Sequence, residues 1–217
     1  RPEWQSRRRM VFLSPVLKSH PVRWCSAVLR EVFMKVAAFN CSPRKDGNTA
    51  ALLRAVCAEL ERAGIASELI HAAGTPIRGC MGCYRCAAAK NRRCAVEDDP
   101  LNGYIAKMEE ADGILIGSPT YFADVTAETK ALIDRAGFVS RANGEMFARK
   151  AGAAVVAVRR AGGIHAFDTI NHFFTIGRMI VVGSSYWNIG IGRNSGEVGA
   201  DEEGMRTMKV LGENMAW

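Results

Sequence analysis

The 217-residue sequence predicts an α/β protein: a three-layer sandwich in which a five-stranded parallel sheet is covered by helices on both faces. From residue 34 onward, short apolar runs alternate with longer segments in which apolar residues recur at helical spacing. The composition is that of a globular chain, because 48% of the residues are hydrophobic and 24% are charged.

Most of the expected strands are apolar runs bounded by polar or turn residues. The first run ends at Asn40 and is followed by a polar loop that contains glycine. The third, Asp-Gly-Ile-Leu-Ile-Gly-Ser, is the most continuous of the five and suits a sheet covered on both sides. We expect strands over residues 34–40, 66–71, 112–118, 151–158 and 179–184.

The expected helices have start signals, apolar faces or both. The first repeats apolar residues every four positions over residues 52–60 and ends at Gly64. The second begins at the Asp98-Asp99 pair, and Pro100 suits its first turn. We expect helices over residues 48–64, 98–110, 126–136 and 164–176, and a last helix from residue 201 after the glycine-rich stretch 190–199.

Strands that alternate with helices form right-handed βαβ units, and these units build a parallel sheet. A phosphate-like loop directly after the first strand favours the strand order 2-1-3-4-5 of the flavodoxin-like fold. The sequence shows neither an internal repeat nor a second core. We therefore expect one domain over residues 34–217, with a cysteine loop at residues 78–97.

The net charge of +7 is unevenly distributed along the chain. Residues 1–33 hold seven of the 29 Lys and Arg residues but only two of the 22 acids, so the remainder is close to neutral. We expect residues 1–33 to be an N-terminal extension, disordered or upstream of a native start at Met34. We expect no nucleic-acid partner, and no membrane partner because no apolar run reaches the ~20 residues of a membrane span.

Four of the seven cysteines lie within fifteen residues, in the pattern C-x2-C-x2-C-x7-C. They are Cys80, Cys83, Cys86 and Cys94. Such closely spaced cysteines indicate metal or cluster ligands in a reducing compartment, so we expect a cytoplasmic protein. Three thiolates at this spacing can hold one side of a [4Fe–4S] cluster, with Cys94 as the fourth ligand. Free or redox-active thiols and a zinc site are the alternatives.

Basic residues surround this motif: Arg78, Arg85, Lys90, Arg92 and Arg93. Their charges could offset the negative charge of a four-thiolate cluster and so raise its reduction potential. The alternative is an ordinary solvated loop face.

The phosphate loop, Ser42-Pro-Arg-Lys-Asp-Gly-Asn-Thr49, follows the first strand and leads into a helix N-terminus that can hold an anion. Ser42 and Thr49 add hydroxyl donors, Arg44 adds a cation, and Gly47 allows close backbone approach. Neither a Walker pattern nor G-x-G-x-x-G is present here. The alternative is an ordinary strand-to-helix turn capped by Asn48.

Three loops in order resemble those of the flavodoxin-like NADPH-dependent FMN reductases. The phosphate loop resembles that family's first loop, Ser-Pro-Thr-Tyr-Phe at 118–122 its second flavin loop, and Arg-Arg-Ala-Gly-Gly at 159–163 its third. The resemblance covers residues 34–217 and implies a bound FMN. All three loops follow strands whose carboxyl ends meet at one edge of the sheet, where such sheets bind ligands.

The resemblance implies roles for ten residues. The FMN phosphate would be held by Ser42, Arg44, Asn48 and Thr49. The ribityl chain and isoalloxazine would be bordered by Pro119, Thr120, Tyr121 and Phe122. Gly162 and Gly163 would let the backbone approach the pyrimidine edge of the flavin. Cys41 stands where the family commonly has glycine, and we expect a buried structural residue there.

The cysteine motif resembles that of the iron–sulfur flavoproteins, a branch of the same family in which the last gap is usually shorter. This resemblance implies an FMN-dependent oxidoreductase that passes electrons between NAD(P)H or ferredoxin and an acceptor, as a homodimer or tetramer. One alternative is an NAD(P)H-dependent FMN or quinone reductase without a cluster. Another is a redox carrier or sensor without turnover. We expect the flavin to carry the chemistry and no protein residue to be catalytic.

Overall fold

The computed structural model describes residues 34–217, and the expectations for residues 1–33 lie outside this range. The strands are β1 Lys35–Asn40, β2 Ala66–His71, β3 Gly113–Pro119, β4 Ala151–Val158, β5 Ile180–Val181 and β6 Ile189–Ile191. The helices are α1 Asn48–Arg62, α2 Arg85–Ala89, α3 Leu101–Glu110, α4 Ala127–Ala142, α5 Gly163–Ile176, the 3-10 helix η2 Glu197–Ala200 and α6 Glu202–Ala216. None of the helices in this part of the chain is long and apolar enough to cross a membrane.

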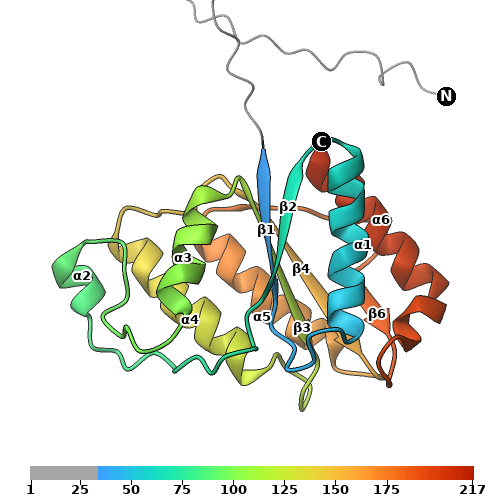
Figure 1. Ribbon diagram of the computed structural model, residues 1–217, viewed down its shortest axis with the longest axis horizontal. Helices are drawn as coiled ribbons and strands as arrows, with labels where there is room; N and C mark the ends of the chain where they lie inside the picture. The colour runs from blue at the N-terminus through green and yellow to red at the C-terminus, as the bar shows by residue number, and fades with distance from the viewer. Residues whose placement is uncertain (1–33) are drawn as a thin grey trace, which may run out of the picture. The chain divides into compact units, whose positions relative to one another are not determined.

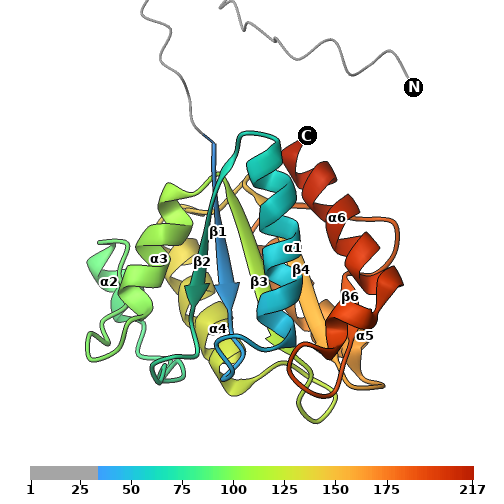
Figure 2. The same ribbon diagram turned by 45° about the vertical axis from the view of Figure 1, so that its right-hand side comes forward.

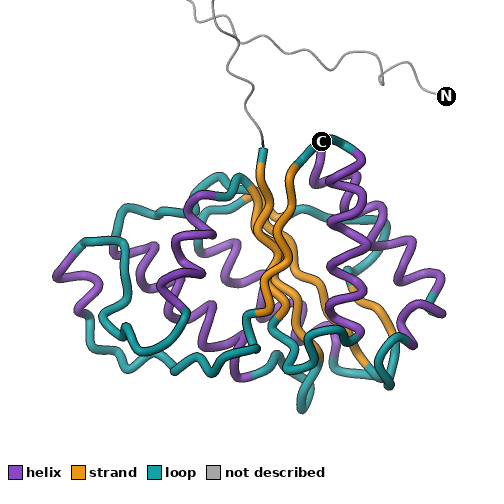
Figure 3. Tube along the Cα trace, viewed as in Figure 1, coloured by secondary structure: helices purple, strands orange, loops and turns teal. Residues whose placement is uncertain are grey.

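The sheet is parallel, with the strand order β2-β1-β3-β4-β5, and carries helices on both faces (Figure 1). This confirms the predicted α/β class and the flavodoxin-like order. In the tube view, helices flank the central strands on both sides (Figure 3). Because all the paired strands run in one direction, the loops after β1 and β3 emerge together at one edge (Figure 2).

The core is divided by the sheet into two layers. Val36 and Ala38 of β1 pack with residues of α1 and α6, while Ala37 and Phe39 pack with residues of α3, α4 and α5. Successive residues of a strand point to opposite faces, so a strand covered on both faces must be apolar at every position. This is why β1 and β3 are continuous apolar runs.

The fifth strand differs from the prediction of residues 179–184. β5 spans two residues only, and a further strand, β6, overlaps the start of the glycine-rich stretch, where no strand is predicted. Both pair with β4: Ile180 lies beside Ala151, and Ile189 lies beside Val156. The edge strand is therefore interrupted, and Asn188 restores the pairing by donating to the Ala154 carbonyl at 3.0 Å.

Helix α4 is longer than the predicted 126–136. Thr126 caps it, because its hydroxyl accepts from the Thr129 N–H at 3.2 Å. The helix then continues through Gly137 to Ala142. A Cβ at Gly137 would make only ordinary contact with Phe173 of α5, so this glycine is an interior helix residue and not a stop.

Candidate functional site: a phosphate pocket and a cysteine pocket

A cavity of about 170 Å³ opens where β1, β3 and β4 end, and this phosphate pocket collects seven of the ten residues predicted to bind FMN. Those seven are Ser42, Arg44, Asn48, Thr49, Pro119, Thr120 and Tyr121. Its other lining residues are Ala157, Arg159, Gly192 and Arg193. Segments from four parts of the sequence thus meet at the predicted edge of the sheet.

The phosphate loop is held in a tight turn by its own polar groups. The Ser42 hydroxyl accepts from the Arg44 N–H at 3.1 Å, and the Asn40 side chain accepts from the Ser42 N–H at 3.1 Å. Gly47 precedes α1, and no side chain of the described residues caps this helix. The Asn48-capped turn is therefore not what forms, and the first N–H groups of α1 remain available to an anion.

Asn48 of the phosphate loop forms hydrogen bonds with the distant segment 192–198. Its Oδ1 accepts from the Gly196 N–H at 2.9 Å and from the Val198 N–H at 3.4 Å. Ser195 donates to the Asp46 carbonyl at 3.0 Å in the same region. These bonds bring segment 192–198 against the loop and place Arg193 at the pocket.

The 118–122 loop forms another wall of the phosphate pocket. The Thr120 N–H donates to the Ala157 carbonyl at 2.9 Å, which fixes the loop beside β4. The Thr120 hydroxyl is buried and has no hydrogen-bond partner among the described residues. A buried hydroxyl without a partner is costly, so this orphaned group fits a pocket completed by a polar ligand such as FMN.

Three predicted flavin residues lie outside the phosphate pocket. Phe122 is fully exposed at the tip of its loop. Gly162 and Gly163 line a separate cavity of about 340 Å³, together with Tyr186 and Trp187. A Cβ at Gly162 would lie 2.7 Å from the Ala123 Cα, so this glycine lets the 159–163 loop approach the 118–122 loop.

Cys41 is fully buried beside the phosphate loop. Burial raises the pKa of its thiol to about 12. The thiol therefore stays protonated in the folded chain, which fits the expected structural role.

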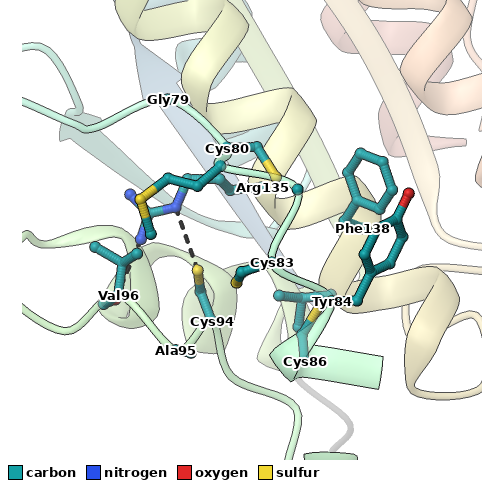
Figure 4. A pocket seen from close by; sticks show the side chains of 13 residues that line it. Gly79, Cys80, Cys83, Tyr84, Cys86, Cys94, Ala95, Val96, Arg135 and Phe138 are labelled. Carbon is teal, nitrogen blue, oxygen red and sulfur yellow. Dashed lines mark hydrogen bonds between the residues drawn. The ribbon is translucent and has the colours of Figure 1, made fainter. Parts of the chain in front are cut away.

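The cysteine loop extends from β2 to α3 along the outside of the α3–α4 layer (Figure 1). All four of its cysteines line one pocket, together with residues of α4 (Figure 4). Cys80 and Cys83 are exposed, whereas Cys86 and Cys94 are partly buried. Burial raises the pKa of the Cys86 thiol.

The donor set of this pocket is four thiols, which is the ligand chemistry of an iron–sulfur cluster. Within residues 34–217, no three His, Cys, Asp or Glu side chains are arranged so that they could already hold a metal ion. The fit to a cluster therefore rests on the chemistry of the four thiols and on the pocket that they share.

Cys94 is the most firmly held of the four cysteines. The Asn102 side chain accepts from the Cys94 N–H at 2.8 Å and donates to the Cys94 carbonyl at 3.0 Å and the Val96 carbonyl at 3.2 Å. Arg135 of α4 donates from Nε to the Cys94 Sγ at 3.4 Å (Figure 4). Neither Asn102 nor Arg135 was predicted as a site residue.

Arg135 is also paired with Asp99, and both side chains are buried. Burial raises the pKa of Asp99, but hydrogen bonds from Arg135, the Arg78 N–H and the Leu101 N–H outweigh it and hold the pKa below its ordinary value. Asp99 therefore remains a carboxylate beside the guanidinium.

The phosphate pocket and the cysteine pocket share no lining residue. Helix α4 connects them, because it begins directly after the 118–122 loop and presents Arg135 to the cysteines. Eight residues separate Ala127 from Arg135, which corresponds to about 12 Å along a helix axis. The start of α4 thus lies next to the 118–122 loop, and the middle of the same helix lies at the cysteine pocket.

This fold and phosphate pocket define a flavodoxin-like flavoprotein. Residues 34–194 match the model of the NADPH-dependent FMN reductase family, and the chain belongs to this family. It is accordingly a flavin-dependent oxidoreductase.

Known relatives agree with this family, and solved structures agree with the fold. The chain is 35% identical over 189 residues to an iron-sulfur flavoprotein of Methanocaldococcus jannaschii, a match that covers 84% of this chain and 96% of the relative. The fold is similar to that of RosB with bound 8-demethyl-8-formylriboflavin-5'-phosphate, with a TM-score of 0.68, 18% identity and coverage of 84% of this chain and 77% of that one. It is also similar to a flavodoxin, WrbA-like protein from Agrobacterium tumefaciens, with a TM-score of 0.55, 15% identity and coverage of 85% and 95%.

Proposed function

We propose that the chain binds FMN in the phosphate pocket and a [4Fe–4S] cluster in the cysteine pocket, and that it passes electrons between NAD(P)H or ferredoxin and an acceptor. The observation that carries this proposal is the meeting of all four motif thiols at one pocket beside a buried guanidinium. Several relatives of the chain bear the name iron-sulfur flavoprotein, which supports the same assignment.

Bound FMN would supply two-electron and one-electron chemistry. The chain's own residues bind and orient it. The N–H groups at the start of α1, with the hydroxyls of Ser42 and Thr49, would donate to the phosphate. Arg44 and Arg193 would offset its charge, and the Thr120 hydroxyl would gain the partner that it lacks among the described residues.

The thiols of Cys80, Cys83, Cys86 and Cys94 would hold the cluster. Cys80 and Cys83 lie at the exposed side of the loop, so electrons would enter or leave there through a small-molecule or protein partner such as ferredoxin. These exposed free thiols favour a reducing, cytoplasmic environment.

We also propose a homodimer or a tetramer. Tyr186 and Trp187 are exposed beside the broken edge of the sheet, and so is Ile191, which lines the same cavity. Exposed apolar side chains gathered in this way are typical of a surface that is covered in an assembly. Sedimentation of the FMN-loaded chain would measure its mass.

The test is anaerobic purification followed by iron, sulfide and flavin analysis. We expect one FMN and about four iron and four sulfide per chain, as a [4Fe–4S] centre requires. Cys83→Ala should lose the cluster and keep FMN. Cys57→Ala is the matched control, because it removes a thiol from α1, on the other side of the sheet, and should keep both. FMN without stoichiometric iron in the wild-type chain would refute the cluster.

The second candidate is an NAD(P)H-dependent FMN or quinone reductase without a cluster. The arrangement of the thiols favours it, because no three of them are placed to bind a metal within the described residues. Under this alternative, Cys83→Ala leaves NAD(P)H oxidation with a quinone acceptor unchanged. Membership of the reductase family favours either enzyme over a carrier without turnover.

A further inference from the structure

We propose that Arg135 positions the fourth cluster ligand, Cys94, and raises the reduction potential of the cluster. This inference rests on the proposed function, since it concerns a residue that would act on a bound cluster through its ligand.

Arg135 ties together the two ends of the cysteine loop from a single buried position. Its side chain is 1% exposed on α4. Nη1 donates to the Arg78 carbonyl at 2.9 Å and to the Asp99 carboxylate, at the beginning and the end of the loop. Nη2 donates to the Val96 carbonyl at 3.2 Å, two residues after Cys94.

The remaining donor of this network, Nε, is directed at the Cys94 sulfur at 3.4 Å (Figure 4). A guanidinium carries five N–H donors in a fixed fork and keeps its charge at all relevant pH values. Lysine offers three donors on one atom and could not reach these separated acceptors together. The position therefore requires arginine if one side chain is to hold the Cys94 sulfur and the loop carbonyls of Arg78 and Val96 at once.

A cluster held by four thiolates is anionic and gains a further negative charge when it is reduced. A fixed cation at one sulfur stabilises the reduced form more than the oxidised form, and hydrogen bonds to the sulfurs act in the same direction. Arg135 is buried, so solvent and salt screen its charge weakly. Asp99 offsets part of this charge and thereby limits the effect.

Arg93 provides the matched comparison. It is adjacent to Cys94 in sequence, but its side chain is exposed and no hydrogen bond joins it to the sulfur among the described residues. Arg93→Gln and Arg135→Gln remove the same charge, one from solvent and one from the buried network. A purely electrostatic effect of net charge would be equal in the two variants.

The experiment uses the full chain, loaded with FMN and with cluster under anaerobic conditions. The cluster potential is measured by a redox titration, and cluster retention is measured in the presence of an iron chelator. For Arg135→Gln we expect a potential below that of the wild type and of Arg93→Gln. We expect retention to fall about 10- to 100-fold, as for other residues that orient metal ligands.

Asp99→Asn separates this role from a merely structural one. It also weakens the network, but it removes the opposing charge, so we expect its potential to rise while that of Arg135→Gln falls. Two variants that only loosened the loop would shift the potential in the same direction. A common direction, or potential and retention in Arg135→Gln equal to those of Arg93→Gln, would overturn the inference.

Failure of the proposed function can be distinguished from failure of this inference, because only the former predicts that the wild-type chain takes up no iron. FMN content and circular dichroism establish that each variant is folded. If Arg135→Gln does not fold, Arg135→Lys keeps the charge without the fork, and we expect lower retention with a potential near the wild-type value. A wild-type retention in Arg135→Lys, or an unchanged potential in Asp99→Asn, then overturns the inference.

Discussion

Replacement of Asn102 by alanine tests how much the structure of the cysteine loop depends on one buried amide. Asn102 is 7% exposed, in the first turn of α3. Its side chain makes three hydrogen bonds to backbone groups of the loop: one from the Cys94 N–H at 2.8 Å, and one each to the carbonyls of Cys94 at 3.0 Å and Val96 at 3.2 Å. Alanine removes all three and leaves their partners in place.

Each hydrogen bond contributes about 1 kcal/mol net, so three contribute about 3 kcal/mol. The Val96 carbonyl keeps its bond from Arg135, which reduces the loss. Alanine also favours the helix by roughly 0.5 kcal/mol relative to asparagine. We therefore expect the free energy of unfolding to fall by about 2–3 kcal/mol, which lowers the melting temperature by about 4–12 °C in a domain of this size.

Urea unfolding followed by circular dichroism measures this change, and hydrogen exchange at the Cys94 amide locates it in the loop. The matched control is Asn214→Ala, which removes one exposed hydrogen bond to the Gly183 carbonyl at 2.9 Å. We expect the control to cost about 0.5 kcal/mol. A loss in Asn102→Ala that is no larger than in Asn214→Ala would show that the loop is not held by this amide.

Three further predictions follow from the phosphate pocket and its surroundings. Cys41 keeps its proton in the folded chain between its ordinary pKa of 9.0 and its raised pKa of about 12, whereas the unfolded chain loses it. Stability should therefore fall as the pH rises through this interval, and urea midpoints should show a smaller fall in Cys41→Ala; an equal fall would assign the effect to other groups. Gly162→Ala should lower the free energy of unfolding by about 1 kcal/mol or more beyond Gly64→Ala in urea unfolding. Both glycines have a left-handed φ, of +84° and +79°, but only at Gly162 would the new Cβ meet another backbone, that of Ala123; equal losses would contradict this. Arg193→Gln should weaken FMN binding about 10- to 100-fold in a fluorescence titration and leave riboflavin binding unchanged, because riboflavin lacks the phosphate; an equal loss for both flavins would remove Arg193 from the phosphate site.

The local sequence predicts the fold well where burial is uniform and less well at the edge of the sheet. The three central strands, β1, β3 and β4, are buried runs, and their residues could not be polar without cost. At the edge, Ile180 and Val181 are exposed, so their apolar character did not mark the extent of a buried strand. The sequence predicts no strand at Gly190, yet this residue lies in β6. A Cβ there would lie 2.6 Å from the Leu52 Cδ2, so the glycine allows α1 to pack closely against β6.

In the phosphate pocket, residues of one local segment could be predicted, whereas a residue from a distant segment could not. Ser42 and Thr49 could be predicted because they lie in one loop between a strand and a helix, where the spacing itself indicates an anion site. Arg193 enters from about 150 residues further along the chain, through the bonds that Asn48 makes to segment 192–198. No local pattern records that contact, although a single arginine within a glycine-rich stretch was a usable signal.

The spacing of the cysteine motif does not predict which basic residue contacts the cysteines. The sequence places five basic residues around the motif, and the structure exposes Arg78, Arg85 and Arg92 to solvent, where charges are screened. The cation that touches a cysteine sulfur is Arg135, 41 residues after Cys94 and buried on another helix. An exposed guanidinium offsets charge weakly, whereas a buried one with a carboxylate partner and three further acceptors is fixed in place. The electrostatics of the cysteine pocket are therefore determined by the packing of α4 against the loop, and the bases within the motif have the weaker influence.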